Sequence, residues 1–299
     1  MSENKKSVNA MEVVSKYKKK SQTADIFRRL ARNKTAIIGL AVVLFLLLLA
    51  IFADVLHDYD SQVIKQDIMQ RLQSPSSEHW FGTDEMGRDI FARVCYGAKY
   101  SLLISFVAAT ASLTVGLICG SIAGYYGGKA DMIIMRFMDV LLAIPGTLLA
   151  IAIVASLGST ITNLIIALSV SGIPGFSRIV RSSVLTVRDS EYVEAARAIG
   201  ATDRTIIFKH VLPNGMAPLI VQSTLSIASV ILTTAGLSFL GLGVPAPHPE
   251  WGAMLSNARS YIRDYSYMAL FPGLAIMTTI LCLNLLGDGL RDALDPRLK

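Results

Sequence analysis

Charged residues are scarce in this chain: they make up 17% of its 299 residues, against about a quarter in a soluble domain. Hydrophobic residues reach 53%, so there is ample apolar surface to bury and intrinsic disorder is excluded. Cysteine is scarce too: Cys95, Cys119 and Cys282 are too few, and odd in number, for a disulfide framework. With a mean hydropathy of +0.51, the composition indicates a polytopic membrane protein.

Sequence motifs for bond chemistry are missing as well. The nearest candidate for a phosphate-binding loop, residues 127–130, has Ala123 in place of the earlier glycine and no Ser or Thr after Lys129. Residues 236–238 match a serine nucleophile turn only weakly, since all four histidines fall in loops or at helix ends. The sequence contains no HExxH motif and no cluster with metal-ligand spacing. We therefore expect no enzyme activity, and neither a cofactor nor a metal, in this chain.

Long uncharged runs predict six membrane-spanning helices. A span needs about 20 apolar residues to cross a hydrocarbon core of about 30 Å. The run 140–177 is too long for one helix, and the polar turn at residues 158–163 divides it into two spans. Single spans are expected in residues 36–53, 100–128, 217–239 and 265–287. The expected fold is therefore an all-α membrane protein with six transmembrane helices.

The distribution of Lys and Arg predicts that both termini are cytoplasmic. Six spans place the two ends on one side, and taking that side as the cytoplasm puts 21 of the 28 basic residues inside and 7 outside. This bias fits the positive-inside rule, and with the polar, Lys-rich start of the chain it fits a bacterial plasma membrane. We expect a basic cytoplasmic tail in residues 1–35, a first transmembrane helix in 36–56, an extracytoplasmic segment in 57–99 and a five-helix core in 100–299.

The basic tail contains an amphipathic stretch. Ile26, Phe27 and Leu30 fall on one side of a helix over residues 25–34, and basic side chains occupy the other positions. This pattern predicts a short helix lying on the inner leaflet before the first span. The positive-inside signal explains its charges, and a contact with lipid or a partner explains them as well.

Ionisable side chains are nearly absent from the expected spans. Each one costs about 2.5–3.5 kcal/mol at mid-bilayer on insertion scales. Only Asp139 and Asp288 come close, and both lie near cytoplasmic ends. Asn163 and Asn284 are the other strongly polar groups, and hydrogen bonds between helices explain them as well as substrate contact does. A proton-coupled carrier needs more than this, so the energy for transport is expected from elsewhere.

The loop at residues 178–214 carries the most specific pattern in the chain. Asp189 or Ser190 is suited to cap a helix, and Gly200 suits the left-handed residue that ends one. A second short helix is expected to follow until Pro213 stops it. The loop is therefore predicted to form a compact knob that faces the cytoplasm.

This loop resembles the EAA signature of permease subunits in bacterial binding-protein-dependent ABC importers. The matching positions are Glu194, Ala195, Ala196, Gly200, Leu212 and Pro213. Where the signature has Ile two residues before its Leu-Pro pair, this chain has His210. By the resemblance, the six residues form the coupling helix that docks on an ATPase subunit, and the small alanine side chains let that partner approach closely. The resemblance also implies the permease fold of type I ABC importers.

A second set of motifs resembles the C-type permease of dipeptide and oligopeptide importers. These motifs are residues 80–84 (Trp-Phe-Gly-Thr-Asp), 87–89 (Gly-Arg-Asp), 236–243, 287–292 and 295–297. The resemblance extends from about residue 28 to the end of the chain. It is weakest in the first 20 residues and in residues 57–77.

The last outer loop, residues 241–267, is rich in proline and aromatic residues. Trp251 and nearby tyrosines are suited to form an anchor at the membrane interface. We also consider that Glu250 and Trp251 form part of an outer gate or contact a substrate-binding protein.

The resemblance implies how the chain works and with which partners. It implies a second homologous permease subunit, two ATPase subunits that carry ATP and magnesium, and an extracytoplasmic substrate-binding protein. Peptides are the expected substrate class, while nickel or metallophore importers and glutathione importers share this permease type. A stand-alone secondary carrier or channel is the alternative from another class. Nothing in the sequence indicates nucleic-acid binding.

Overall fold

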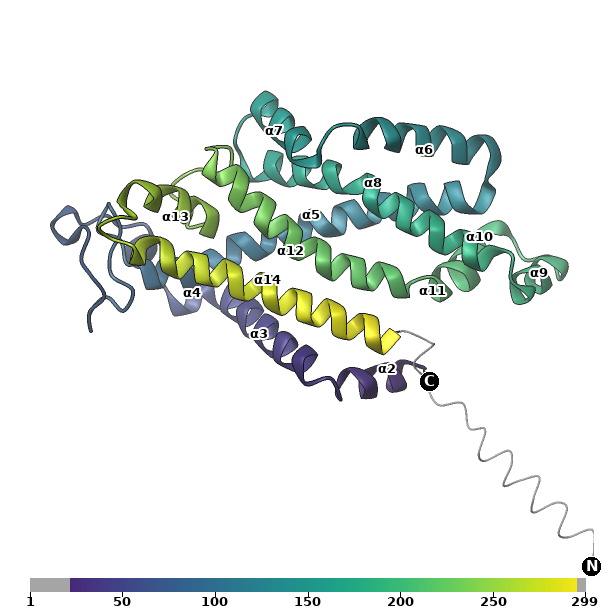
Figure 1. The fold of residues 1–299 in the computed structure, drawn as a ribbon, viewed down its shortest axis with the longest axis horizontal. Helices are drawn as coiled ribbons and strands as arrows, with labels where there is room; N and C mark the ends of the chain where they lie inside the picture. Colours follow the sequence, from purple (N-terminus) through teal and green to yellow (C-terminus); the bar gives the residue numbers. More distant parts are fainter. Residues whose placement is uncertain (1–21, 295–299) are drawn as a thin grey trace, which may run out of the picture.

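The computed structural model of the protein describes residues 22–294 and is helical, with no strand in that part of the chain (Figure 1). Residues 1–21 of the expected basic tail and the motif at 295–297 lie outside the described residues. The helices are α2 (Gln22–Leu30), α3 (Lys34–Ile51), α4 (Ala53–Leu56), α5 (Ile90–Tyr126), α6 (Gly128–Leu142), α7 (Gly146–Leu157), α8 (Ile161–Arg188), α9 (Glu191–Ala198), α10 (Asp203–Ile206), α11 (Leu212–Asn214), α12 (Ala217–Phe239), α13 (Trp251–Ala258) and α14 (Tyr267–Leu294). Short π turns cover Tyr59–Val63 and Ile207–Val211, and 3₁₀ turns cover Ile68–Gln70 and Arg259–Tyr261.

Five helices are long and apolar enough to cross a membrane, namely α3, α5, α8, α12 and α14. Taken together, α6 and α7 are long and apolar enough for a sixth crossing, and they are bent by 81° at the break between them. The sequence predicted a continuous span at this point, and that expectation is wrong. Pro145 has no N–H to donate into a continuing helix and disfavours helical backbone at Ile144, so α6 ends before it.

The helix α5 begins at Ile90, well before the apolar run that starts at residue 100. Its 37 residues make it about 55 Å long at 1.5 Å per residue. Asp89 caps the start, because its carboxylate accepts a hydrogen bond of 2.8 Å from the backbone N–H of Ala92. The helix of the second span therefore begins within residues 57–99, the segment that was expected to be extracytoplasmic.

Glycines bring α5 and α8 into close contact. A Cβ atom at Gly116 would lie 2.5 Å from the Cβ of Phe176, and one at Gly120 would lie 2.5 Å from the carbonyl oxygen of Ser177. Gly124 continues this face one turn later, against Val184. Small residues at every fourth position let the two helix backbones approach closely. In lipid there is little hydrophobic force between helices, so this tight packing is what holds them together.

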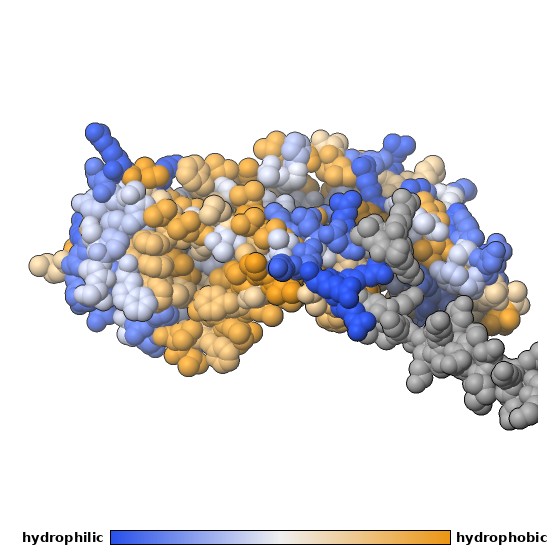
Figure 2. All heavy atoms as spheres, turned by 60° about the horizontal axis from the view of Figure 1, so that its bottom comes forward, coloured by the Kyte–Doolittle hydropathy of each residue, from blue (hydrophilic) through white to orange (hydrophobic). Residues whose placement is uncertain are grey.

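The two ends of the described chain lie at the same end of the molecule as α9 (Figure 1). Ile26 and Leu30 of α2 pack against Leu290 and Ala293 of α14, while Phe27 is 71% exposed. The predicted amphipathic helix is thus present, although it ends at Leu30 and its apolar face is shared between α14 and the surroundings. On the face where α3 and α14 come forward, a hydrophobic belt lies between more hydrophilic ends (Figure 2).

Candidate functional site

The chain between α8 and α12 folds as a helical knob, which we define as residues 189–214. The helix α8 continues to Arg188, so the first part of the expected loop is still a spanning helix. Ser190 then stands at the N-cap position of α9 with extended backbone angles, and its hydroxyl donates to the carbonyl oxygen of Val187 at 2.7 Å. Glu191 and Glu194 lie in the first turn of α9, where negative charge stabilises the helix.

One face of α9 is buried inside the chain. Val193 is 0% and Ala196 6% exposed, and they share a hydrophobic cluster with Val184 of α8 and with Ile206 and Val211 of the second half of the knob. Ala196 therefore packs inward and is not available to a partner. Ala195 and Glu194 are exposed on the other face.

Gly200 ends α9 with a φ of +85°, as its position after the helix predicted. A Cβ atom placed at this glycine would meet nothing within 4 Å, so Gly200 does not make room for a neighbouring element of this chain. The value of glycine at this position lies in its backbone conformation, which side chains with a Cβ rarely adopt.

The second half of the knob continues past Pro213, which was expected to stop it. Leu212 donates its N–H to the carbonyl oxygen of Ile207, five residues earlier, in a widened π turn. Pro213 then falls in the first turn of α11, where its missing N–H has no helical partner to lose. Leu212 is buried and Pro213 is exposed, so only the proline of this pair reaches the surface.

One polar contact ties the knob to the end of α5 and another ties the end of α8 to it, and sequence reasoning missed both. The phenol of Tyr125 donates to the carboxylate of Asp203 at 2.7 Å, and Arg188 donates to the carbonyl oxygen of Gly124 at 2.8 Å. Arg197 also hydrogen-bonds Tyr125. This bond raises the pKa of the Arg197 guanidinium above its usual value. Together with the glycine contacts, these bonds make α5, α8 and the knob one packed unit.

The exposed surface of the knob combines charge with apolar side chains. Ile199 is 86%, Phe208 63% and Tyr192 45% exposed, on the same small unit as exposed Glu194. His210 is half-buried, and its carbonyl oxygen accepts a hydrogen bond of 2.7 Å from the side chain of Asn214. Exposed large apolar groups on a small, rigid unit are typical of a protein docking surface.

Glu250 is buried between helices, at 1% exposure. Its carboxylate accepts hydrogen bonds from the backbone N–H groups of Gly252 and Ala253, both at 2.8 Å, and from the hydroxyl of Ser238 at 2.7 Å. The hydroxyl of Ser101 lies 3.4 Å away on α5. One side chain therefore caps α13 and fastens it to α12 and α5.

Trp251 is buried beside it, also at 1% exposure, and its indole N–H donates to the carbonyl oxygen of Val94 at 2.9 Å. Gly97 makes room for the ring, since a Cβ atom there would lie 2.9 Å from an indole carbon. The expected interfacial anchor at Trp251 is wrong. Buried side chains cannot contact another protein directly, so Glu250 and Trp251 form a joint in this conformation, and their part in an outer gate stays a prediction.

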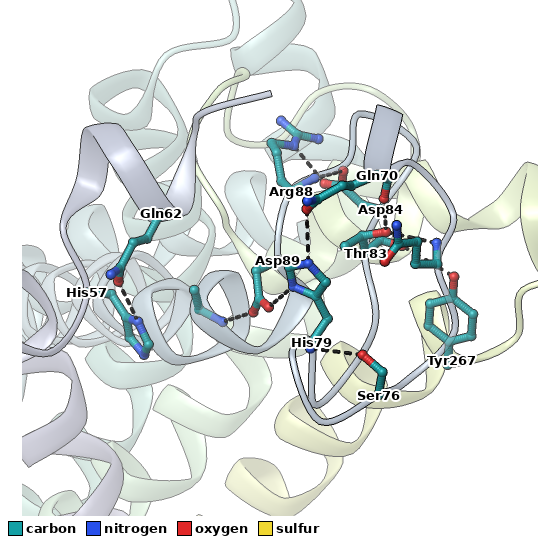
Figure 3. A network of polar contacts seen from close by, with 12 residues as sticks. His57, Gln62, Gln70, Ser76, His79, Thr83, Asp84, Arg88, Asp89 and Tyr267 are labelled. Atoms are coloured by element: carbon teal, nitrogen blue, oxygen red, sulfur yellow. Dashed lines mark hydrogen bonds and ion pairs between the residues drawn. The ribbon is translucent and has the colours of Figure 1, made fainter. Parts of the chain in front are cut away.

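The motifs at residues 80–84 and 87–89 form a turn held by the buried charges of Asp84 and Arg88 (Figure 3). Asp84 accepts hydrogen bonds from the backbone N–H groups of Met86 and Arg88 and from the guanidinium of Arg88 at 2.6 Å. Arg93 lies 3.5 Å from the same carboxylate. Nearby, the ring of His79 contacts Asp89 at 2.7 Å and Gln70 at 3.1 Å. These contacts order the segment between α4 and α5 against the start of α5.

The described residues contain no group of three His, Cys, Asp or Glu side chains arranged to hold a metal ion. The polar groups described above instead form hydrogen bonds and ion pairs that hold helices and turns together. The geometry provides a rigid knob at one end of the molecule, the ordered segment between α4 and α5 at the other, and apolar helices between them.

Two family models match the chain. The model described as "Binding-protein-dependent transport system inner membrane component" matches residues 116–299, and the model described as "N-terminal TM domain of oligopeptide transport permease C" matches residues 21–75. The matched regions together include all the spanning helices except the first part of α5.

Curated relatives are similar over nearly the whole length. The "Dipeptide transport system permease protein DppC" of Alkalihalophilus pseudofirmus is 50% identical over 92% of this chain and 90% of its own. The "Glutathione transport system permease protein GsiD" of Pectobacterium atrosepticum is 46% identical over 92% of this chain and 91% of its own. The protein of the same name in Escherichia coli is 45% identical over 98% of this chain and 96% of its own.

Solved structures share the fold. An inward-facing structure of the MetNI methionine ABC transporter matches with a TM-score of 0.54 and 19% identity, over 66% of this chain and 94% of the matched chain. An amino acid ABC transporter solved with histidines matches with a TM-score of 0.50 and 16% identity, over 64% and 89%.

Proposed function

The chain belongs to the family of binding-protein-dependent transport system inner membrane components, and we propose that it is the permease subunit of an ATP-driven importer of di- and oligopeptides. As a member of this family it is a multi-pass protein of the inner membrane. The observation that carries the peptide assignment is its 50% identity, over 92% of the chain, to a dipeptide transport permease.

The knob is proposed to receive the force from an ATPase subunit. Glu194 and Ala195 present the contact face of α9, and Tyr192, Ile199 and Phe208 add apolar surface around it. The tight α5–α8 contact and the Tyr125–Asp203 bond support this role, because a displacement of the knob then moves two spanning helices as a body. ATP and magnesium would be held by the ATPase subunits.

The assembly is proposed to contain this chain, one homologous permease, two ATPase subunits and an extracytoplasmic binding protein. The translocation path lies between the two permeases. The charge bias of the sequence supports a cytoplasmic position for the knob and for both ends of the described chain, and so does their common position at one end of the molecule.

Glutathione is the second candidate substrate, and the 46% identity to a glutathione transport permease favours it. Glutathione is itself a short peptide, so the two proposals differ in the substrate and share the mechanism. A nickel or metallophore substrate has no such relative among those compared above. A stand-alone carrier or channel is disfavoured by the family to which the chain belongs.

The test is uptake in a strain deleted for this gene and in its complemented parent. Both receive labelled di-, tri- and pentapeptides, labelled glutathione and, separately, radioactive nickel. Loss of peptide uptake in the deletion strain, restored by the gene, is the expected result and also gives the accepted length range. Loss of glutathione or nickel uptake with intact uptake of every other peptide would contradict the peptide assignment and replace it.

A further inference from the structure

A cavity of about 640 Å³ opens on the segment between α4 and α5, at the end of the molecule opposite the knob (Figure 1). One wall is aromatic: the ring of Phe91 lies 4.9 Å from the ring of Trp80 and 5.7 Å from that of His57, measured between ring centroids. The polar side of the cavity includes His79 and Asp89 (Figure 3). An aromatic wall that faces a few hydrogen-bonding groups is the usual composition of a binding pocket.

The polar side of this cavity is already held in place within the chain. The ring of His79 contacts Asp89 at 2.7 Å and Gln70 at 3.1 Å, so it is fixed through both nitrogens. The backbone N–H of Asp67, another lining residue, donates to the carbonyl oxygen of Met86 at 3.0 Å. The cavity is therefore preformed, and a partner that enters it does not have to order its wall.

Three lining side chains are left without polar partners. Trp80 is 64% exposed, and Lys65 and Glu78 are exposed as well. Within residues 22–294, the side chains of these three residues form no hydrogen bond or ion pair. Charged groups are unfavourable against lipid, so the mouth of the cavity faces water or protein. An exposed tryptophan at the rim of a preformed pocket is typical of a protein interface.

The charge of this segment is opposite to that of the whole chain. The protein has a net charge of +6, but residues 57–89 contain seven Asp or Glu and three Lys or Arg, which gives the segment a net charge of −4. Such a segment attracts and orients a partner that presents positive charge. Under the proposed function, this end of the molecule faces the extracytoplasmic side, where a binding protein delivers the substrate.

We propose that the cavity docks a basic side chain of the extracytoplasmic binding protein; this rests on the proposed function. The cationic group stacks on the exposed indole of Trp80 and pairs with the carboxylate of Glu78. Ile68 and Met69, both exposed, lie in the chain between two lining residues and add apolar area outside the cavity. A dipeptide is too small to cover that area together with the cavity, which favours a protein over the free substrate as the occupant.

The test measures the affinity of the binding protein for the assembled transporter in lipid nanodiscs. The probe is the purified binding protein whose deletion abolishes the same peptide uptake, and biolayer interferometry gives the Kd. We expect Trp80→Ala to raise the Kd at least fivefold and Glu78→Lys at least tenfold. Glu78→Gln should raise it less and should weaken its dependence on salt, because one charge pair is lost. Both positions are exposed, so the variants should assemble in wild-type amounts.

The matched control is Asp264→Lys, the same reversal of charge at an exposed position between α13 and α14 and outside the cavity. We expect it to change the Kd less than threefold. An increase equal to that of Glu78→Lys would show that the net charge acts and the cavity does not, which would overturn the site.

The occupant is identified by Trp80→p-benzoylphenylalanine, which forms a covalent cross-link to its neighbour on illumination. We expect a cross-link to a segment of the binding protein that contains Lys or Arg. Cross-links to lipid or to the second permease alone would overturn the proposal, as would an unchanged Kd in both Trp80→Ala and Glu78→Lys. A wild-type transporter that imports no peptide in the presence of the binding protein contradicts the proposed function itself, so the uptake assay tells the two failures apart.

Discussion

The phenol of Tyr125 at the end of α5 donates a hydrogen bond of 2.7 Å to Asp203 in the knob, which lies 78 residues further along the chain. This bond joins a spanning helix directly to the surface that we propose receives the ATPase. Tyr125 also contacts Arg197 of α9, so one side chain bridges both halves of the knob. The connection is a fixed one, since Tyr125 is itself largely buried.

Tyr125→Phe is expected to weaken coupling without unfolding the protein. The substitution removes the hydrogen bond to the exposed carboxylate of Asp203, a loss of about 1 kcal/mol, together with the contact to Arg197. We expect peptide uptake to fall about fivefold at an unchanged membrane level, the change that about 1 kcal/mol produces. The control is Tyr126→Phe, on the next residue, which is 56% exposed and should transport normally. Equal uptake by Tyr125→Phe and the wild type would contradict a role for this bond.

Gly120→Ala is expected to destabilise the α5–α8 contact. The new methyl group would lie 2.5 Å from the carbonyl oxygen of Ser177 and 2.6 Å from the Cβ of Val180, neither of which can move aside freely. Overpacking of this kind costs about 1–3 kcal/mol. Thermal unfolding of the purified complex in detergent measures the effect. Gly236→Ala, in α12, is the control, because a Cβ atom there meets nothing within 4 Å. Equal melting temperatures for the two variants would show that the close approach of α5 and α8 is unimportant for stability.

Gly200→Val and Gly200→Asn separate backbone conformation from packing at the end of α9. Because φ is +85°, a β-branched residue is strained there by about 1–2 kcal/mol, whereas asparagine tolerates the left-handed region better. We expect Gly200→Val to lower uptake and Gly200→Asn to retain most of it. If the two variants transport equally well, the left-handed conformation is not what the position requires.

Glu250→Ala is expected to destabilise the outer end of the protein. It leaves two backbone N–H groups of α13 and the hydroxyl of Ser238 without their acceptor in a buried site. Each unsatisfied buried group costs about 1–3 kcal/mol, so the variant should accumulate poorly in the membrane. Glu250→Gln keeps a side-chain oxygen that can accept hydrogen bonds, so it should recover part of the membrane level of the wild type. Glu78→Ala, at an exposed position between α4 and α5, is the control and should accumulate as the wild type does. Normal accumulation of Glu250→Ala would refute the proposed joint.

The sequence predicted what depends on local pattern. Apolar runs located the crossings, and the position of Gly200 after a helical stretch predicted its left-handed backbone. Local chemistry also accounts for the break in the third span, because Pro145 disfavours helical backbone at Ile144. Attention to that proline would have predicted the break between α6 and α7.

Contacts between distant residues could not be predicted from one sequence. In the sequence, Glu250 is a charged residue in a proline-rich loop. Only the fold brings it near Ser101, which lies 149 residues earlier in the chain. Likewise, Glu194 and Ala195 are exposed while Ala196 is buried because of the orientation of α9 about its own axis where it packs against α8. Such rotations are fixed by tertiary packing, which the local pattern leaves open.

The most direct test of the coupling mechanism is peptide uptake by Glu194→Lys. Because Glu194 is exposed, the substitution should leave the fold and the membrane level intact while reversing the charge on the docking face of α9. We predict that labelled dipeptide uptake is lost in a strain whose complex contains this variant at wild-type amounts. Full uptake under the same conditions would contradict the claim that the knob transmits the force of the ATPase to the spanning helices.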